Sequence, residues 1–398
     1  MAVACGGDGD GGSASAGGPG SSGAPGHTGG ASSSDAGAAG ANETTAGDGG
    51  EPSSSGGAPG NQGGVGGEAT GGSGTSGAAG AAAAAGAAGA PVLPPSCSAA
   101  GAGLACGSSS ESCCTSLPIP GGQFYRSYDA VTFVDQTHPA SITGFGLDKY
   151  EVTVGRFRKF VSAVVGSWRP ASGDGKRADV NLGKGLANVG PAGGNEAGWN
   201  EAWNTQLASS ALNWKTNLSC STAATWTEAA GKNERLPINC VNWYEALAFC
   251  IWDEARLPSE AEWNDAASGG MQQRVFPWSS PAVSQTIDCA HANYHGALGP
   301  DYCTLPGAGG VNAVGSESPL GDGRWGHADL SGNVFEWVLD WYAPYTANCP
   351  DCVYFEDLPN HVIRGGGYAN DADFLLSAGR RANGTADRAG SIGLRCAR

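Results

Sequence analysis

The sequence predicts one large folded domain that contains both helices and strands and follows a long segment of low complexity. Composition changes near residue 100, because the first 100 residues hold nearly half of the 68 glycines and lack Phe, Trp, Tyr, Lys and Arg. Two patterns predict mixed secondary structure beyond that point. Residues 146–153 alternate in side-chain character as a strand does, and residues 241–255 carry an apolar stripe at helical spacing.

Residues 1–96 are rich in glycine, alanine and serine. Such a segment has too little apolar surface to offset the entropy of ordering its backbone, so we expect a disordered tether. Within it, the small residues Ala2, Val3 and Ala4 precede Cys5 as they would in the cleavage box of a bacterial lipoprotein. The basic and apolar regions of a complete signal peptide do not precede them. Cys5 is therefore a candidate lipid anchor if the true start lies upstream, and otherwise a coincidence.

Twelve of the thirteen cysteines lie from Cys97 onward, which predicts an exported protein in an oxidising compartment. Zinc is the competing explanation, but the one Cys-x-x-Cys motif, Cys349 to Cys352, has no second motif to complete a site. We therefore expect disulfides. Expected pairs are Cys220 with Cys240 and Cys349 with Cys352, and Cys289 could pair with Cys303.

Residues 97–117 hold four cysteines and almost no core residues, which predicts a small disulfide-linked cap on the domain. Four cysteines allow three pairings. The neighbours Cys113 and Cys114 are expected to pair apart, with Cys97 and Cys106, in an order that the sequence leaves open.

The net charge of −16 comes from 37 acidic and 21 basic residues. This balance argues against a nucleic-acid partner, which selects basic surfaces. No stretch reaches the 18 or so apolar residues that a membrane helix requires. The expected partner is thus an unidentified protein or small molecule, and contact with a membrane is expected only through an N-terminal lipid.

Three helices are indicated by their spacing. Val154, Phe157, Val161 and Val164 share one helical face, and a second helix covers 241–255. Ser259 and Glu262 form a capping-box pattern for a third helix. Residues 165–234 show little periodicity and read as long loops. Their tryptophans are expected to anchor those loops to the core or, alternatively, to form a carbohydrate-binding platform; they are Trp168, Trp199, Trp203, Trp214 and Trp226.

The segment 322–341 brings oxygen donors close together in sequence. The carboxylates of Asp329 and Glu336 and the carbonyls of Gly332 and Val334 recur two to three residues apart, and a compact loop could turn them towards one point. Ca²⁺ prefers such sets of carboxylate and backbone oxygens. The alternative is an ordinary tight turn before a strand, with Glu336 paired to an arginine.

The same segment contains DLSGNVFEWVLDWY, which resembles the signature of the formylglycine-generating enzyme family, also called sulfatase-modifying factors. Four further motifs agree in order: LDKYEVTVGRFRKFV (147–161), RLPINCVNWYEALAFCIWDEARLPSEAEWNDAA (235–267), VIRGGGYAND (362–371) and IGLRCAR (392–398). The resemblance covers roughly residues 118–398. It implies an α+β class with the loop-rich, C-type-lectin-like fold of that family, an assignment that periodicity alone does not supply.

The resemblance also implies site residues. A second calcium site would use Asn293, Tyr294, Asp301 and Cys303. A family disulfide would join Cys250 to Cys396. A second family disulfide is replaced by residues near Ala267 and Ser377.

Active members of the family bind copper(I) through two cysteines that follow a Gly-Gly-x-Tyr turn. Here the first position is Asn370 and the second falls near Leu375, and neither side chain can form a copper thiolate. Copper and formylglycine-generating activity are therefore not expected. We expect an exported, calcium-stabilised binding or scaffold module at a bacterial cell surface. The alternative is an oxidoreductase that uses non-haem iron or another metal. His291 and His295 could contribute to such a site but are expected to be loop histidines.

Overall fold

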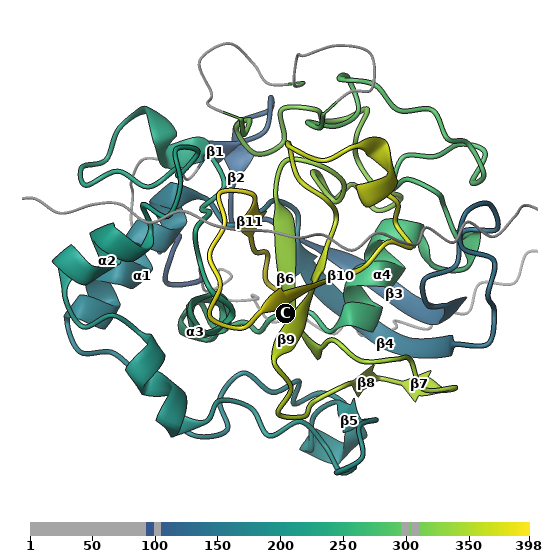
Figure 1. The fold of residues 1–398 in the computed structure, drawn as a ribbon, viewed down its shortest axis with the longest axis horizontal. Helices are drawn as coiled ribbons and strands as arrows, with labels where there is room; N and C mark the ends of the chain where they lie inside the picture. The colour runs from purple at the N-terminus through teal and green to yellow at the C-terminus, as the bar shows by residue number, and fades with distance from the viewer. Residues whose placement is uncertain (1–92, 99–104, 296–302, 304–309) are drawn as a thin grey trace, which may run out of the picture. The chain divides into compact units, whose positions relative to one another are not determined.

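The computed structural model describes residues 93–98, 105–295, 303 and 310–398 (Figure 1). The chain divides into two units, Met1–Ala82 and Ala83–Arg398, and every described residue lies in the second. The predicted tether up to residue 92, the candidate lipidation site Cys5 and the predicted cation ligand Asp301 therefore lie outside the described residues.

Two sheets form the centre of the second unit (Figure 1). In the four-stranded sheet, of order β10-β9-β6-β11, β6 pairs antiparallel with β9 and parallel with β11. Its strands are β6 (Phe335–Trp341), β9 (Asn360–Arg364), β10 (Arg381–Gly384) and β11 (Ile392–Gly393). The other sheet contains β3 (Ser116–Tyr125), β4 (Pro139–Asp148) and β7 (Cys349–Pro350). Two small pairs are β1 (Ala105–Cys106) with β2 (Glu111–Ser112), and β5 (Ala187–Asn188) with β8 (Cys352–Val353).

Helices pack around these sheets and are joined by long loops. The α-helices of the described residues are α1 (Val154–Val165), α2 (Ala211–Asn217), α3 (Trp243–Trp252) and α4 (Glu260–Ser268). Short 3-10 helices cover Asn181–Gly183, Glu201–Gln206, Lys232–Arg235, Gly270–Gln272 and Ala372–Phe374. This mixture of short elements and long loops confirms the predicted α+β class.

Local sequence chemistry sets the helix starts. Both α3 and α4 begin with a capping box, in which the side chain of Asn242 or Ser259 accepts from the backbone three residues on and Glu245 or Glu262 bonds back. The capping box at Ser259 is the predicted one. The strand predicted over 146–153 is wrong in its second half, because β4 ends at Asp148 and the following residues lead directly into α1.

The largest core cluster lies where α1 and α3 meet. Phe157 and Phe160 of α1 both contact Phe249 of α3, with ring centroids 5.5 and 5.7 Å apart. Trp199 from a loop and Trp214 from α2 are also buried there, so these two act as the predicted anchors. The prediction of long loops over residues 165–234 is wrong at α2, which lies within that stretch. Trp168, Trp203 and Trp226 are partly buried and pack against the same core.

All twelve cysteines from Cys97 onward form disulfides, which confirms each predicted pairing. The cap uses Cys97–Cys114 and Cys106–Cys113, so its neighbouring cysteines do pair apart. The remaining bonds are Cys220–Cys240, Cys250–Cys396, Cys289–Cys303 and Cys349–Cys352. Where the family's second disulfide would lie, the hydroxyl of Ser377 donates to the carbonyl of Ala267 at 3.1 Å.

Loop length should set how much each disulfide contributes to stability. The Cys250–Cys396 bond closes a separation of 146 residues, and Cys349–Cys352 closes only three. In the chain-entropy description, replacing both cysteines of a pair by alanine should cost about 5 kcal/mol for the long loop and about 2 kcal/mol for the short one. Denaturant unfolding of the two double variants measures both values, and equal losses would contradict this account.

A second prediction concerns Asp265 in α4, a buried carboxylate whose two oxygens have no hydrogen-bond partner within the described part of the chain. Burial and the nearby charge of Glu262 raise the pKa of Asp265 to about 7. Between about pH 4 and pH 7 the unfolded chain ionises this group while the folded protein keeps its proton, so the free energy of unfolding falls as pH rises.

The Asp265→Asn variant cannot ionise at this position and should lack that decline. Between pH 4 and pH 8 the free energy of unfolding of the variant should rise by up to about 3 kcal/mol relative to that of the wild type. Urea unfolding at both pH values measures this difference. Replacement of the exposed Asp373 by Asn is the control and should follow the wild type. A parallel pH response of D265N and wild type would refute the assignment.

Candidate functional site

The two predicted cation segments lie against each other. Asp329 and Asn333 adopt left-handed backbone conformations in the loop before β6, with φ of 56° and 57°. Gly332 between them has φ of 90°, and a Cβ there would lie 2.6 Å from the carbonyl oxygen of Asn293. Only glycine fits this close approach. The backbone N–H of Asn333 also donates to that carbonyl, at 2.8 Å.

Glu336 pairs with Arg395, as the alternative reading of the sequence allowed. Three N–H···O contacts of 2.6–2.8 Å join the guanidinium group to the two carboxylate oxygens. The indole N–H of Trp263 donates to the same carboxylate at 2.8 Å. All three side chains are buried. The donors Arg395 and Trp263 therefore fix the carboxylate of Glu336, which lies at the start of β6.

Other carboxylates around this loop accept hydrogen bonds from neutral groups but form no ion pair among the described residues. Glu151 and Asp329 are buried, and Glu317 lies partly buried beside them. Burial, followed by the charge of Glu317, raises the pKa of Asp329 to about 8. Burial, followed by the charges of Asp329 and Glu336, raises the pKa of Glu151 well above its usual value. A divalent cation among these groups would remove the repulsion that raises these pKa values.

Three asparagines connect the acids. The amide of Asn333 donates to Glu151 at 2.6 Å, and its oxygen accepts from the side chain of Asn293 at 3.1 Å and the backbone N–H of Asn312 at 2.9 Å. The amide of Asn312 donates to Glu317 at 2.6 Å. This arrangement leaves the side-chain oxygen of Asn293 and one oxygen of Glu317 buried without a donor among the described residues. Unpaired buried acceptors of this kind fit a bound cation.

Two of the remaining predicted ligands, the carbonyls of Tyr294 and Cys303, already accept hydrogen bonds. The carbonyl of Tyr294 accepts from the backbone N–H of Cys303 at 3.0 Å, and the carbonyl of Cys303 accepts from Asn312 at 3.2 Å. Among the loop and turn hydrogen bonds of the described residues, none uses the carbonyl oxygen of Gly332 or Val334, the two predicted backbone ligands. Within the described residues, no three His, Cys, Asp or Glu side chains converge as a metal ligand set.

Sequence reasoning missed Glu151, Glu317, Asn312 and Asn333. Glu151 lies in one of the motifs quoted above, but its alternating context indicated only a strand. Asn333 lies inside the predicted loop itself. Glu317 and Asn312 follow residues 304–309, which lie outside the described part, and they carry no local pattern that marks them as a site.

The positions that correspond to the copper-binding cysteines are filled differently. The side-chain oxygen of Asn370 accepts from the backbone N–H of Gly367 at 3.1 Å and so closes the turn. Leu375 is fully buried in an apolar cluster with Val275 and Phe276. Since every described cysteine is in a disulfide, this part of the molecule offers no thiol to a soft metal.

The two candidate histidines each have an acidic partner. Nδ1 of His291 lies 2.7 Å from Asp288, and Nδ1 of His295 lies 3.1 Å from Asp371. Their partners come from different segments of the chain. The i, i+4 spacing of these histidines does not lie on a helix, as was expected from the loop-like sequence.

Known proteins resemble this chain over most of its length. It is 28% identical to the formylglycine-generating enzyme of Mus musculus over 301 residues, which cover 71% of this chain and 74% of that protein. It is also 28% identical to the inactive C-alpha-formylglycine-generating enzyme 2 of Bos taurus over 304 residues, covering 71% and 87%. The relative named as an enzyme and the relative named as inactive are thus equally similar to this chain. Overall sequence identity therefore does not indicate whether this chain is active.

Among solved structures, PvdO from Pseudomonas aeruginosa aligns with a TM-score of 0.46 and 21% identity, covering 71% of this chain and 93% of that one. The family assignment itself rests on the sequence, because residues 103–398 match the family described as "Sulfatase-modifying factor enzyme 1-like domain". This chain belongs to the sulfatase-modifying factor enzyme 1-like family.

Proposed function

We propose that this chain is an exported, calcium-stabilised member of its family that lacks formylglycine-generating activity and serves as a binding or scaffold module. A lipid on Cys5 and a tether over residues 1–96 would hold it at a cell surface. The observation that carries the proposal is the use of sulfur, since the twelve cysteines from Cys97 onward are all in disulfides.

The lack of free thiols among the described cysteines argues against formylglycine-generating chemistry. Copper(I) is a soft ion that binds thiolates, and a substrate cysteine can form a mixed disulfide only with a free thiol. The amide of Asn370 and the alkyl chain of Leu375 can do neither. The apolar packing around Leu375 also leaves this position inside the core.

The acid cluster supports calcium. The carboxylates of Glu151, Asp329 and Glu317 and the unpaired oxygen of Asn293 are hard oxygen donors, which suit Ca²⁺ and not copper. Within the described residues no three acidic side chains converge on one point, so backbone carbonyls would have to complete the ligand set. Bound there, the ion would neutralise the buried carboxylates. The bound ion would stabilise the folded domain and fix the shape of the loop before β6.

Six disulfides in one domain support export, because such bonds persist in oxidising compartments. No helix of the described residues combines the length and the apolar character needed to cross a membrane. The iron-dependent oxidoreductase remains the second candidate from the sequence, and no arrangement of the described residues specifically favours it.

Incubation of the purified protein with copper(I), oxygen and a peptide carrying a sulfatase cysteine motif should yield no aldehyde. The expected result follows from the missing thiol pair. An active family enzyme run in parallel shows that the assay works, and mass spectrometry of the peptide detects the product. Aldehyde formation at a rate similar to that of the active enzyme would overturn the proposal.

Calcium at about 100 times its dissociation constant should raise Tm by about 5 °C relative to protein in chelator, since binding would add nearly 3 kcal/mol. The Glu317→Gln variant keeps the acceptor for Asn312 and removes one repelling charge. In chelator it should melt at or above the wild-type temperature, and its response to calcium should be smaller.

The exposed Glu228 provides the matched control, because E228Q changes the same charge outside the cluster. Identical Tm values with calcium and with chelator would reject the calcium assignment. Metal analysis of protein purified without chelator is a second measurement. Stoichiometric iron in that protein would favour the oxidoreductase.

A further inference from the structure

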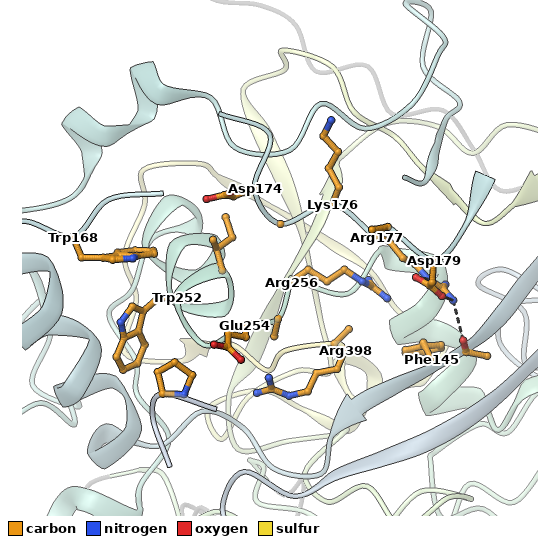
Figure 2. A pocket seen from close by; sticks show the side chains of 17 residues that line it. Phe145, Trp168, Asp174, Lys176, Arg177, Asp179, Trp252, Glu254, Arg256 and Arg398 are labelled. Carbon is orange, nitrogen blue, oxygen red and sulfur yellow. Dashed lines mark hydrogen bonds and ion pairs between the residues drawn. The ribbon is translucent and has the colours of Figure 1, made fainter. Parts of the chain in front are cut away.

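A large cavity lies apart from the acid cluster and from Asn370 and Leu375. Its volume is about 860 Å³, and its walls come from the loop after α1, the end of α3 and the C-terminal residues (Figure 2). This volume is in the range that accommodates a drug-sized ligand. None of the residues predicted to bind a metal or a lipid lines it; of the tryptophans considered for a carbohydrate-binding platform, Trp168 does.

Two indoles form one end of the cavity. Trp168 and Trp252 are partly buried, and their rings lie 6.0 and 5.8 Å from the ring of Phe160, measured between centroids. Figure 2 shows them together on one side of the cavity, with Asp174 and Glu254 as the labelled acidic residues next to them. Phe160 supports both indoles from the core, so their positions are fixed before any ligand arrives.

Two carboxylates, Asp174 and Glu254, line this end of the cavity. The guanidinium group of the neighbouring Arg169 donates to the carbonyls of Val164 and Trp168 at 2.8 and 2.7 Å. One oxygen of Asp174 accepts from the backbone N–H of Ala171 at 2.8 Å, and Glu254 is exposed without a partner among the described residues. Lys176 also lines the cavity, but its side chain extends away from the indoles in Figure 2.

The guanidinium groups in the walls do not offset that charge, because carboxylates already hold them. Arg177 pairs with Asp179 and Glu262, Arg256 with Glu262, and Arg398 with Asp148 and Asp253. The arginine side of the cavity is therefore close to neutral. An anionic ligand would meet no unpaired guanidinium there.

Glu254 occupies a position where glycine would fit better. It follows α3 with φ of 57°, and the next residue, Ala255, donates to the carbonyl of Cys250 at 2.8 Å, which is the helix-ending bond of a Schellman motif. Glycine is favoured at such a left-handed position because other residues are strained there. The glutamate therefore places a carboxylate at the cavity at some cost in local stability.

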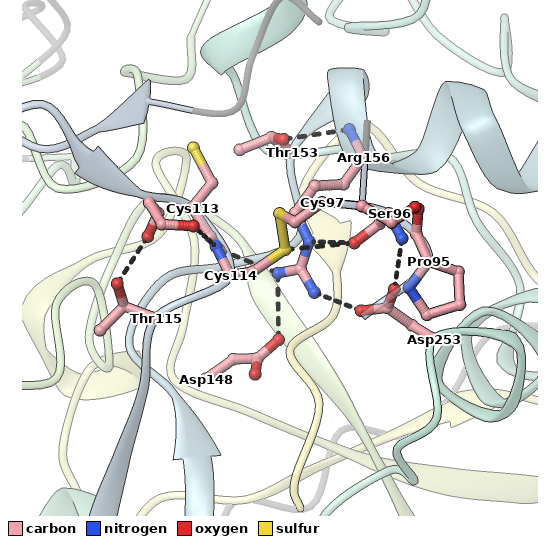
Figure 3. Close-up of a disulfide and its surroundings, with 12 residues drawn as sticks. Pro95, Ser96, Cys97, Cys113, Cys114, Thr115, Asp148, Thr153, Arg156 and Asp253 are labelled. Carbon is pink, nitrogen blue, oxygen red and sulfur yellow. Dashed lines mark hydrogen bonds and ion pairs between the residues drawn. A yellow bond between two sulfur atoms is a disulfide. The ribbon is translucent and has the colours of Figure 1, made fainter. Parts of the chain in front are cut away.

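The cysteine-rich cap and the residues just before it are bonded to Arg156 and to Asp253, the residue that follows α3 (Figure 3). The backbone N–H of Ser96 donates to Asp253 at 2.8 Å, and Arg156 pairs with Asp253 at 2.7 Å. Arg156 also donates to the carbonyl of Cys113 at 3.1 Å. These buried contacts fix Ser96 and Asp253, whose chain neighbours Pro95 and Glu254 line the cavity.

We propose that this cavity binds an organic cation, with its alkylammonium group against Trp168 and Trp252 and its charge compensated by Asp174 and Glu254. Aromatic faces attract such cations through their quadrupole, and the nearby carboxylates add direct charge complementarity. The cavity is larger than an ammonium group, so the remainder of the ligand would extend towards the arginine side. This inference rests on the proposed binding role and names a ligand class for it.

Choline and its uncharged isostere 3,3-dimethylbutan-1-ol provide the test, with binding to the purified full-length protein measured by calorimetry or NMR titration. Choline should bind about tenfold more tightly than the isostere, because only choline carries the charge. Equal binding of both compounds, or of neither, would overturn the proposal. Neither outcome affects the calcium and aldehyde tests, so the two proposals can fail separately.

The Glu254→Gly variant distinguishes a loss of ligand binding from a loss of stability. This variant should weaken choline binding about tenfold and leave Tm unchanged or higher, because glycine suits the left-handed position. Trp252→Ala should also weaken binding, and Trp278→Ala, outside the cavity, should not. Wild-type choline affinity in E254G would contradict the assigned role.

Two sources of the ligand can be distinguished with phosphocholine in solution and with vesicles of phosphatidylcholine. Binding of soluble phosphocholine alone assigns a free solute. Binding of both assigns a lipid head group. Failure of both, together with failure of choline, rejects the site.

Discussion

The covalent link between Cys250 in α3 and Cys396 near the C-terminus is the constraint on which the domain most depends. Helices and strands are short, and the segments between them are long, so regular hydrogen bonding alone leaves much of the backbone unsupported. The disulfide joins the main core helix to the last residues of the chain. Directly beside it in sequence, Arg395 reaches the buried carboxylate of Glu336 on β6. Together these contacts connect α3, the C-terminus and the central sheet.

Local chemistry made part of this structure predictable. The helical stripes and the capping box at Ser259 identify α1, α3 and α4, because these signals depend on residues three or four positions apart. The disulfide pairs followed from cysteine count and from resemblance to the family. Strand limits were harder, as the run after Asp148 shows, because pairing with a distant partner decides where a strand ends.

The site was only partly predictable for the same reason. The loop from Asp329 to Glu336 is contiguous and could be identified, whereas Glu151 and Glu317 reach it from distant segments. Pairing of Glu336 with Arg395 was one of two readings that spacing left open. The cavity beside Trp168 and Trp252 depends on tertiary packing, and a single tryptophan in a loop does not show whether its ring will face the core or a ligand.

The use of sulfur as structural cross-links is the central claim, and a count of free thiols tests it most directly. The protein is denatured without reductant, alkylated and analysed by peptide mass spectrometry. The account predicts no alkylation at any cysteine from Cys97 to Cys396. Alkylation of two cysteines within that range in most molecules would contradict it, because a pair of free thiols could again bind copper.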